Sequence, residues 1–181
     1  MRLLSRYRAT LVFCAFYSTL STQIMGEKVH GTATAFTVFE NFPFALAVFD
    51  MDQDGDLDCV SAIRTQFDKS EPSATYVWMF KGNNPRNVTF HIKPGPTFDT
   101  STYTMDDDYE HEYHANFYFS DYKNCVIFGM PHLDTDECML WVTKKVKDDV
   151  PPICTDKYKE NCDMQVMAYD QETCGEYADY E

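Results

Sequence analysis

Short apolar runs, separated by turn-forming residues, make up most of the chain after residue 43. Each run has strand length and is rich in aromatic or β-branched residues. The predicted strands cover residues 44–49, 57–66, 74–81, 88–92, 100–105, 112–119, 125–130 and 138–142. Many short strands with little convincing helix indicate an all-β sandwich or closed barrel. Eight strands in a meander favour the antiparallel up-and-down barrel, whose interior can hold one small ligand.

The ends of this pattern are less regular. Residues 32–40 suit either a helical turn or a first extended segment, and the pattern does not separate the two. After the strand at 138–142, Pro151-Pro152 ends any regular element. Residues 166–169 form a further candidate strand. Four of the seven cysteines lie between residues 125 and 162, so we expect disulfides to fasten the C-terminal segment to the sheet.

Alternation along two of the late strands predicts which side chains face the inside of the barrel. In 112–119 one face carries only apolar residues, namely Tyr113, Ala115, Phe117 and Phe119. The strand 138–142 is apolar on both faces, so both faces are covered. If Cys138 bridges outward, Met139 and Trp141 line the lumen. A simpler interpretation is that these side chains only fill a core.

The N-terminus has the pattern of a secretory signal peptide. Basic residues at positions 2, 6 and 8 precede an apolar stretch at 9–20, with small residues around Ser21. This stretch is too short for a membrane anchor, which needs about 20 apolar residues. We therefore expect a signal peptide at 1–21 and a single secreted domain at 22–181. Its barrel spans about 44–142, followed by a disulfide-tethered segment at 143–181.

Removal of residues 1–21 leaves 160 residues and six cysteines and changes the formal net charge from −14 to −17. An even number of cysteines in an oxidising compartment indicates three disulfides, although six cysteines allow 15 pairings. The acidity argues against nucleic acid and anionic membranes as partners. The sequence has no recognisable catalytic Ser/His/Asp or Cys/His arrangement, so we expect a monomeric binding protein without enzymatic activity or a cofactor.

Several motifs in a fixed order resemble the tick salivary lipocalins, which include the tick histamine-binding proteins. Phe119-Ser120-Asp121 leads into Asn124-Cys125-Val126-Ile127, and a strand follows with Met139-Leu140-Trp141. Pro152-x-Cys154, a Lys/Tyr-rich turn and a last cysteine complete the order, and Cys59-Val60-Ser61-Ala62 matches upstream. The resemblance covers residues 44–176, while the Asp-Ala-Trp signature of the family's N-terminal helix is absent.

The resemblance implies an eight-stranded lipocalin barrel with a short C-terminal helix and three disulfides. It pairs Cys59 with Cys174, Cys125 with Cys154 and, by elimination, Cys138 with Cys162. It also implies that amine binders of the family carry carboxylates at two positions, which here are Met139 and Ala115. A buried ammonium needs an opposite charge. The apolar lumen expected here therefore favours a fatty acid or leukotriene-like lipid, and Asp50 and the aromatic residues keep an amine in consideration.

Two further motifs carry separate hypotheses. Asp50, Asp52, Asp54 and Asp58 with Gly55 have calcium-loop spacing, but position 12 is Ser61 and the flanks are strands. An acidic hairpin turn is the simpler interpretation of this loop. Asn87-Val88-Thr89 is a glycosylation sequon.

The function predicted from the sequence is sequestration of a small host mediator in the barrel, which would suppress host inflammation or haemostasis. The expected ligand site comprises Asp50, Tyr113, Ala115, Phe117, Phe119, Met139 and Trp141. One alternative is a plugged barrel whose loops bind a host complement or clotting protein in plasma. Another is a calcium-dependent secreted module using the loop at 50–58.

Overall fold

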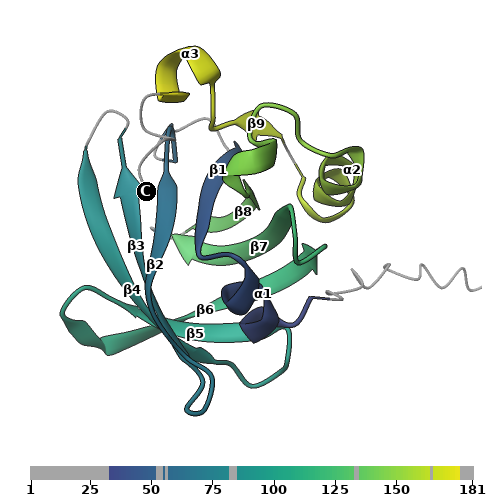
Figure 1. Cartoon of the computed structure of the whole chain (residues 1–181). Coiled ribbons are helices and arrows are strands. Elements are labelled where there is room, and N and C mark those ends of the chain that lie inside the picture. The colour runs from purple at the N-terminus through teal and green to yellow at the C-terminus, as the bar shows by residue number, and fades with distance from the viewer. Residues whose placement is uncertain are drawn as a thin grey trace, which may run out of the picture.

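The computed structural model describes residues 33–51, 55, 57–81, 85–132, 135–163 and 165–175. Its main feature is an antiparallel meander of eight strands that curls into a barrel (Figure 1). The barrel strands are β1 (Phe44–Asp50), β2 (Ser61–Asp68), β3 (Ser73–Phe80), β4 (Arg86–Pro94), β5 (Thr100–Met105), β6 (Asp108–Ser120), β7 (Cys125–His132) and β8 (Thr135–Val142). Each pairs with its neighbour in the chain, and β1 pairs with both β8 and β2. The pairing of β1 with β8 joins the first strand to the last and closes the barrel, as the meander predicts.

The strands separate two apolar cores. On β1, Ala45 and Ala47 belong to the inner core, whereas Leu46 and Val48 belong to an outer core beneath the C-terminal segment. On β8, Met139 and Trp141 face inward, and Leu140 and Val142 face outward. Both faces of these strands are therefore covered, which explains why their sequences are apolar throughout rather than alternating.

One end of the barrel is covered by the short helix α1 (Ala35–Asn41). The helix buries Ala35, Val38 and Phe39, which are spaced three and four residues apart and so share one face. Phe42, at its C-terminal end, is buried as well. Of the two interpretations open for residues 32–40, the structure has the helix. At that end the backbone N–H of Ala35 donates to the carbonyl of Phe98 at 2.9 Å.

The largest differences from the predicted strand starts are in β2 and β6, which each begin four residues away from the prediction. The strand predicted to begin at Leu57 begins at Ser61, because residues 57–59 turn and Cys59 has a φ of +56°, which a strand does not allow. The acidic run at 106–112, most of which the sequence pattern left between the predicted strands 100–105 and 112–119, is mostly strand. Only Asp106 and Asp107 form the turn, and β6 starts at Asp108 with exposed side chains.

The C-terminal segment packs against the outside of the barrel. It comprises the turn η1 (Lys144–Val146), α2 (Pro152–Asn161), β9 (Val166–Met167) and α3 (Gln171–Cys174). β9 pairs with the end of β1, which confirms part of the strand expected at 166–169. None of the helices in the described ranges is long and apolar enough to cross a membrane.

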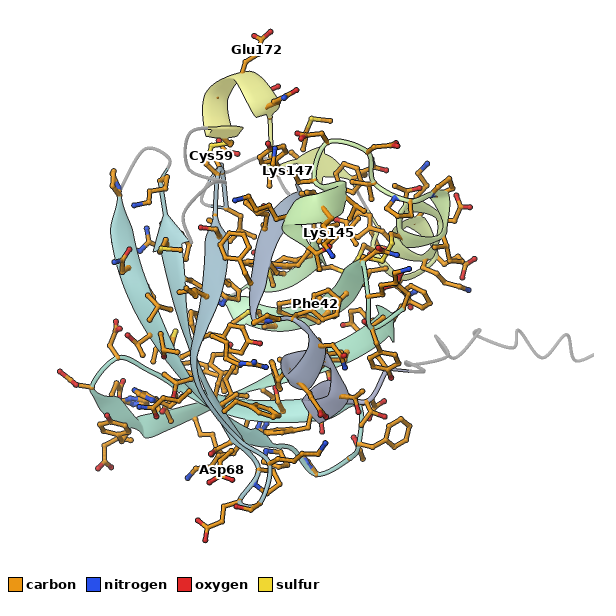
Figure 2. The ribbon with its side chains drawn as sticks, viewed as in Figure 1. Phe42, Cys59, Asp68, Lys145, Lys147 and Glu172 are labelled. Atoms are coloured by element: carbon orange, nitrogen blue, oxygen red, sulfur yellow. A yellow bond between two sulfur atoms is a disulfide. The ribbon has the colours of Figure 1, made fainter. Side chains whose placement is uncertain are left out.

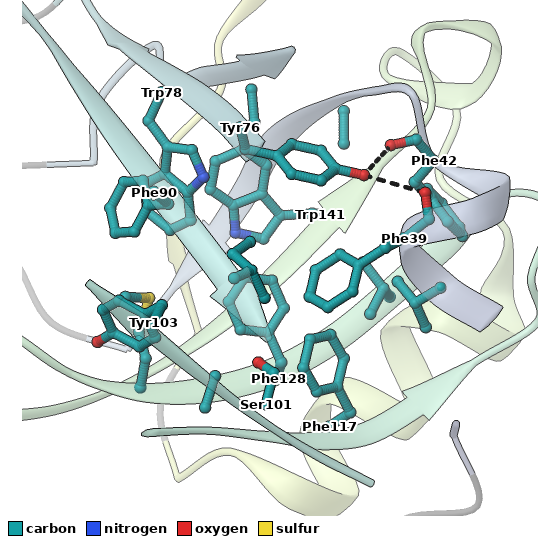
Figure 3. Close-up of a pocket in the computed structure, with 17 residues that line it drawn as sticks. Phe39, Phe42, Tyr76, Trp78, Phe90, Ser101, Tyr103, Phe117, Phe128 and Trp141 are labelled. Carbon is teal, nitrogen blue, oxygen red and sulfur yellow. Dashed lines mark hydrogen bonds between the residues drawn. The ribbon is translucent and has the colours of Figure 1, made fainter. Parts of the chain in front are cut away.

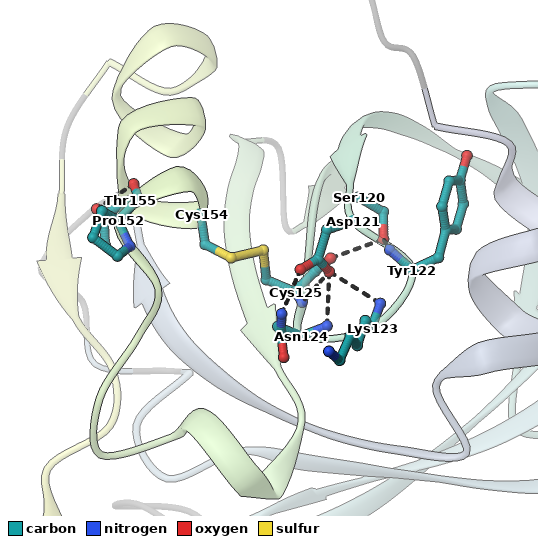
Figure 4. The surroundings of a disulfide bond; sticks show 9 residues. All are labelled: Ser120, Asp121, Tyr122, Lys123, Asn124, Cys125, Pro152, Cys154 and Thr155. Carbon is teal, nitrogen blue, oxygen red and sulfur yellow. Dashed lines mark hydrogen bonds between the residues drawn. A yellow bond between two sulfur atoms is a disulfide. The ribbon is translucent and has the colours of Figure 1, made fainter.

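Three disulfides attach this segment to the strands. The pairs are Cys59–Cys174, Cys125–Cys154 and Cys138–Cys162, as the family resemblance implied. Cys125 begins β7 and Cys154 lies in the first turn of α2 (Figure 4). Beside Cys125, one carboxylate oxygen of Asp121 accepts the backbone N–H groups of residues 123, 124 and 125 at 3.0, 2.7 and 3.0 Å. The carboxylate therefore fixes the turn that starts β7.

Candidate functional site

The inner core contains a cavity of about 70 Å³ between α1 and the middle of the barrel (Figure 3). Seventeen residues line it: Val38, Phe39, Phe42, Ala45, Ala62, Tyr76, Trp78, Phe90, Ile92, Ser101, Tyr103, Ala115, Phe117, Val126, Phe128, Met130 and Trp141. None of them carries a charge. Their polar side-chain groups are the hydroxyls of Ser101, Tyr76 and Tyr103 and the indole N–H groups of Trp78 and Trp141.

Aromatic rings form most of the cavity wall. The ring centroids of Trp78 lie 4.6 Å from those of Trp141 and 4.5 Å from those of Phe90. Phe117 stacks on Phe128 at 5.3 Å, and Phe39 of α1 meets the edge of Phe117 at 5.4 Å. Such contacts stabilise the rings beyond the burial of their area. The wall is therefore a packed set of rings that leaves a small apolar space.

Tyr76 links this wall to the helix above it. Its hydroxyl donates to the backbone carbonyl of Phe42 at 2.6 Å and lies 3.3 Å from the carbonyl of Phe39. The Arg64 guanidinium donates to the carbonyl of Phe39 and, at 3.1 Å, to that of Glu40. These groups satisfy carbonyls at the helix C-terminus, which have no partner within the helix. Two strand residues thus hold α1 over the cavity.

Changing Tyr76 to Phe is expected to loosen α1 while leaving the barrel closed. The substitution removes a donor from a buried carbonyl, which costs about 1 to 3 kcal/mol. Hydrogen exchange should become faster at the amides of Val38 and Phe42, which bond within the helix. Exchange in the β7–β8 pair is the internal control. Unchanged protection of α1 would contradict the role assigned to Tyr76.

The structure places five of the seven predicted site residues in the inner core or against it. Ala115, Phe117 and Trp141 line the cavity. Met139 and Tyr113 belong to or pack against the inner core but do not line the cavity. The sulfur of Met139 lies 3.5 Å from Nε1 of Trp141, which donates to it. Whether these residues bind a ligand stays a prediction.

Phe119 was wrongly assigned to the lumen. It packs against the outer core and pairs with Ile127, which also faces outward. The register shifts between Phe117 and Phe119, so a β-bulge reverses the alternation at this point. A prediction that assumes strict alternation along the strand cannot locate such a bulge.

Two carboxylates outside the cavity lining, Asp50 on β1 and Glu137 on β8, are buried. Glu137 is 2% exposed and pairs with Met130, a cavity residue, so it shares the inner face of the sheet. Asp50 is 3% exposed and follows the bulge in β1, which turns its side chain inward after the outward-facing Phe49. Glu137 lies just before the predicted strand 138–142, so the sequence pattern did not place it on a strand. Extending the strand alternation from Trp141 and Met139 by two more residues reaches Glu137 and would have predicted its inward face.

Tyr158 of α2 reaches the backbone next to both carboxylates from outside the barrel. Its hydroxyl lies 2.7 Å from the carbonyl of Asp50 and 3.0 Å from that of Cys138. Burial raises the pKa of Tyr158, and the negative charges of Asp50 and Glu137 raise it further. Burial also raises the pKa values of Tyr76 and Tyr103.

From the raised pKa values of these three tyrosines we expect the free energy of unfolding to fall at alkaline pH. A raised pKa means that the unfolded chain loses the phenol proton first, so the free energy of unfolding falls as pH rises above about 10. Each tyrosine contributes a slope of about 1.4 kcal/mol per pH unit. Urea midpoints at pH 9 and pH 11 measure the total. Tyr158→Phe should remove about one of the three contributions, and an unchanged slope in this variant would contradict its assignment.

The remaining predicted sites are only partly covered by the structure. Asp52 and Asp54 of the calcium hypothesis, and the signal peptide at 1–21, lie outside the described residues. Asp58 is exposed. The one cluster of potential metal ligands found among the described residues is Asp121 with Cys125 and Cys154, whose sulfurs are bonded to each other. Asn87 is exposed on β4, and its glycosylation stays a prediction.

Comparison with known proteins places this geometry among ligand-binding lipocalins. The model of the family described as "Tick histamine binding protein" matches residues 28–176. The structure is similar to that of Japanin from Rhipicephalus appendiculatus bound to cholesterol, with a TM-score of 0.52 and 14% sequence identity. That similarity covers 72% of this chain and 94% of Japanin. No curated protein sequence matches the chain.

Proposed function

Because the chain belongs to the tick histamine-binding protein family, we propose that it is secreted and sequesters a small apolar mediator of the host in the barrel lumen. The observation that carries this proposal is the uncharged lining of the cavity beneath α1. An ammonium in that cavity would lack a counter-charge, which is costly in an apolar site. The hydrocarbon part of a lipid, such as a fatty acid, a leukotriene or a sterol, has no such cost. An acidic lipid would keep its carboxylate outside the cavity, because no lining residue is basic.

The size of the cavity requires the lumen to widen on binding. A ligand pocket usually encloses about 300 to 1,000 Å³, whereas this cavity encloses about 70 Å³. The element best suited to move is α1. It has seven residues, which is too short to be stable alone, and its N-cap Thr34 makes no side-chain capping bond. Withdrawal of Phe39 and Phe42 with the helix would free the space that their rings occupy.

Binding assays with a lumen-filling variant test this proposal. Ala115 is buried and lines the cavity, whereas its neighbour Asn116 is exposed on the other face of β6. Ala115→Leu is expected to weaken the binding of cholesterol, arachidonate or leukotriene at least tenfold, because the added side chain occupies the cavity. Asn116→Leu adds a similar apolar side chain outside the barrel and should bind as the parent protein does. Isothermal titration measures both.

The outcomes separate the proposed class of ligand from its alternatives. Equal weakening by Ala115→Leu and Asn116→Leu would contradict a lumen site. If none of these lipids binds the parent protein, the lipid proposal fails. A barrel plugged by its own rings, with loops that contact a host plasma protein, would then become the better explanation.

An amine is the second candidate, and the buried pair Asp50 and Glu137 favours it. Two carboxylates on the inner side of a barrel are a suitable counter-charge for an ammonium group. This site would lie outside the lining of the apolar cavity. Glu137 lies two residues before Met139 on β8, so the two share one face of the strand. Met139 occupies the position at which the family resemblance implies a carboxylate in amine binders.

Titration with histamine distinguishes the two candidates. Under the amine proposal, Glu137→Gln should weaken histamine binding by at least tenfold, since it removes a charge and keeps the shape. Ala115→Leu should leave histamine binding unchanged. Histamine binding that is unaffected by Glu137→Gln would remove this candidate.

A further inference from the structure

A groove on the outside of the barrel gathers positive charge on a strongly acidic chain. It encloses about 540 Å³ and is lined by Asn41, Pro43, Phe44, Ile63, Arg64, Lys123, Thr143, Lys144 and Lys145. Four of the 15 Lys and Arg residues of the sequence are therefore in one place, although the formal net charge is −14. No lining residue is acidic. Figure 2 shows Lys145 on the turn η1, near Phe42 at the end of α1.

The fold brings these cations together from three distant segments. Arg64 lies on β2, Lys123 in the loop between β6 and β7, and Lys144 and Lys145 follow β8. Lys123 and Lys145 are exposed. Arg64 is held in place, because it donates to carbonyls of α1 and lies 4.8 Å from the ring centroid of Phe67. The groove thus has one fixed guanidinium and several ammonium groups around it.

Two acidic groups close in sequence to the groove lining, Asp121 and Glu40, have partners of their own. The Asp121 carboxylate accepts three backbone N–H groups at the start of β7. Burial acts to raise the pKa of Asp121, but these bonds and the Asn124 amide outweigh burial and lower it. The Glu40 carboxylate pairs with Lys69 at 2.7 Å. The lining of the groove itself therefore carries only positive charge.

The groove also has apolar and hydroxyl surface. Pro43 directly precedes β1, Phe44 begins it, and Ile63 is the strand partner of Phe44 on β2. Thr143 contributes a buried Oγ1 atom without a hydrogen-bond partner among the described residues. The volume is within the usual range for small-molecule sites, which combine apolar area with a few polar groups.

From this combination we infer that the groove is a second ligand site, separate from the lumen, for a small amphiphilic anion. Its acidic group, a carboxylate, sulfate or phosphate, lies among Lys123, Lys144 and Lys145. Its apolar body lies on Pro43, Phe44 and Ile63. The site needs no movement of α1, in contrast to the lumen. Its existence does not depend on the ligand proposed for the lumen.

Titration with octyl sulfate tests the groove, with 1-octanol and inorganic sulfate as the two halves of the probe. Octyl sulfate is expected to bind more tightly than either half. The double variant Lys123→Glu/Lys145→Glu reverses two exposed charges and should weaken this binding by about tenfold or more. Lys93→Glu/Lys159→Glu makes the same change of net charge at exposed positions outside the groove and should have little effect.

Two further measurements locate the site. Affinity for octyl sulfate should fall with rising salt, and amide NMR shifts should change at Lys123 and Lys145. Ala115→Leu should bind octyl sulfate as the parent protein does, which separates the groove from the lumen. Equal loss in both double variants, binding of sulfate alone with the same affinity, or loss in Ala115→Leu would each overturn the inference.

Discussion

Replacing both Cys59 and Cys174 with alanine is expected to lower the free energy of unfolding by about 4 to 5 kcal/mol. Their disulfide joins residues 115 positions apart, and it links the turn before β2 to α3, the last helix of the described chain. A crosslink restricts the unfolded chain more when it closes a longer loop. Loss of this amount is a large part of the stability of a typical domain. Urea unfolding of the secreted variant measures it.

The Cys138–Cys162 disulfide provides the matched comparison. It spans only 24 positions, so its removal by the same substitution should cost about 3.5 kcal/mol, roughly 1 kcal/mol less. Both bonds join a residue at the barrel to the C-terminal segment, and all four cysteines are buried. A larger loss for the shorter loop would show that native contacts, rather than restriction of the unfolded chain, determine what these bonds contribute.

Trp141→Ala is expected to have the largest effect of any single substitution in the lumen. The side chain is 2% exposed, lines the apolar cavity and packs on Trp78 at 4.6 Å between ring centroids. Truncation of a buried Trp to Ala costs about 3 to 5 kcal/mol through lost contacts and the cavity left behind. The enlarged cavity should also bind benzene, as dry apolar cavities of about 150 Å³ do.

The exposed aromatic residue Tyr109 is the control for this substitution. It is 65% exposed, so Tyr109→Ala should change the free energy of unfolding by less than about 0.5 kcal/mol. Thermal unfolding with and without benzene measures both variants. A Trp141→Ala protein that is as stable as the parent, or that gains no stability from benzene, would contradict the position assigned to Trp141.

Much of the barrel could be predicted because the apolar pattern of each strand indicates its length and which of its faces are buried. The eight-strand meander predicted the closed barrel. Met139 and Trp141 face inward, as predicted for the case in which Cys138 bridges outward. Errors arose where the period of two breaks. The bulge before Phe119 turned one predicted lumen residue outward, and the short turn at Asp106 let β6 begin earlier than its acidic residues indicated.

The polar parts of the candidate sites depend on contacts between distant segments. Asp50 and Glu137 lie on β1 and β8, two strands that pair only when the barrel closes. Arg64, Lys123 and Lys145 share one groove because barrel closure places β2 beside the segment that follows β8. Neither set has a local pattern, since its members are separated by at least 20 residues.

The sequence by itself determined the all-β class and the strand meander, because alternation and turn residues act over a few neighbouring positions. With the family resemblance it also determined the disulfide pairs. Only the tertiary structure decided that the lumen is nearly filled by rings, that α1 covers one end, and that cations gather outside. Those properties depend on how side chains from separate strands fill one volume, which no local pattern encodes.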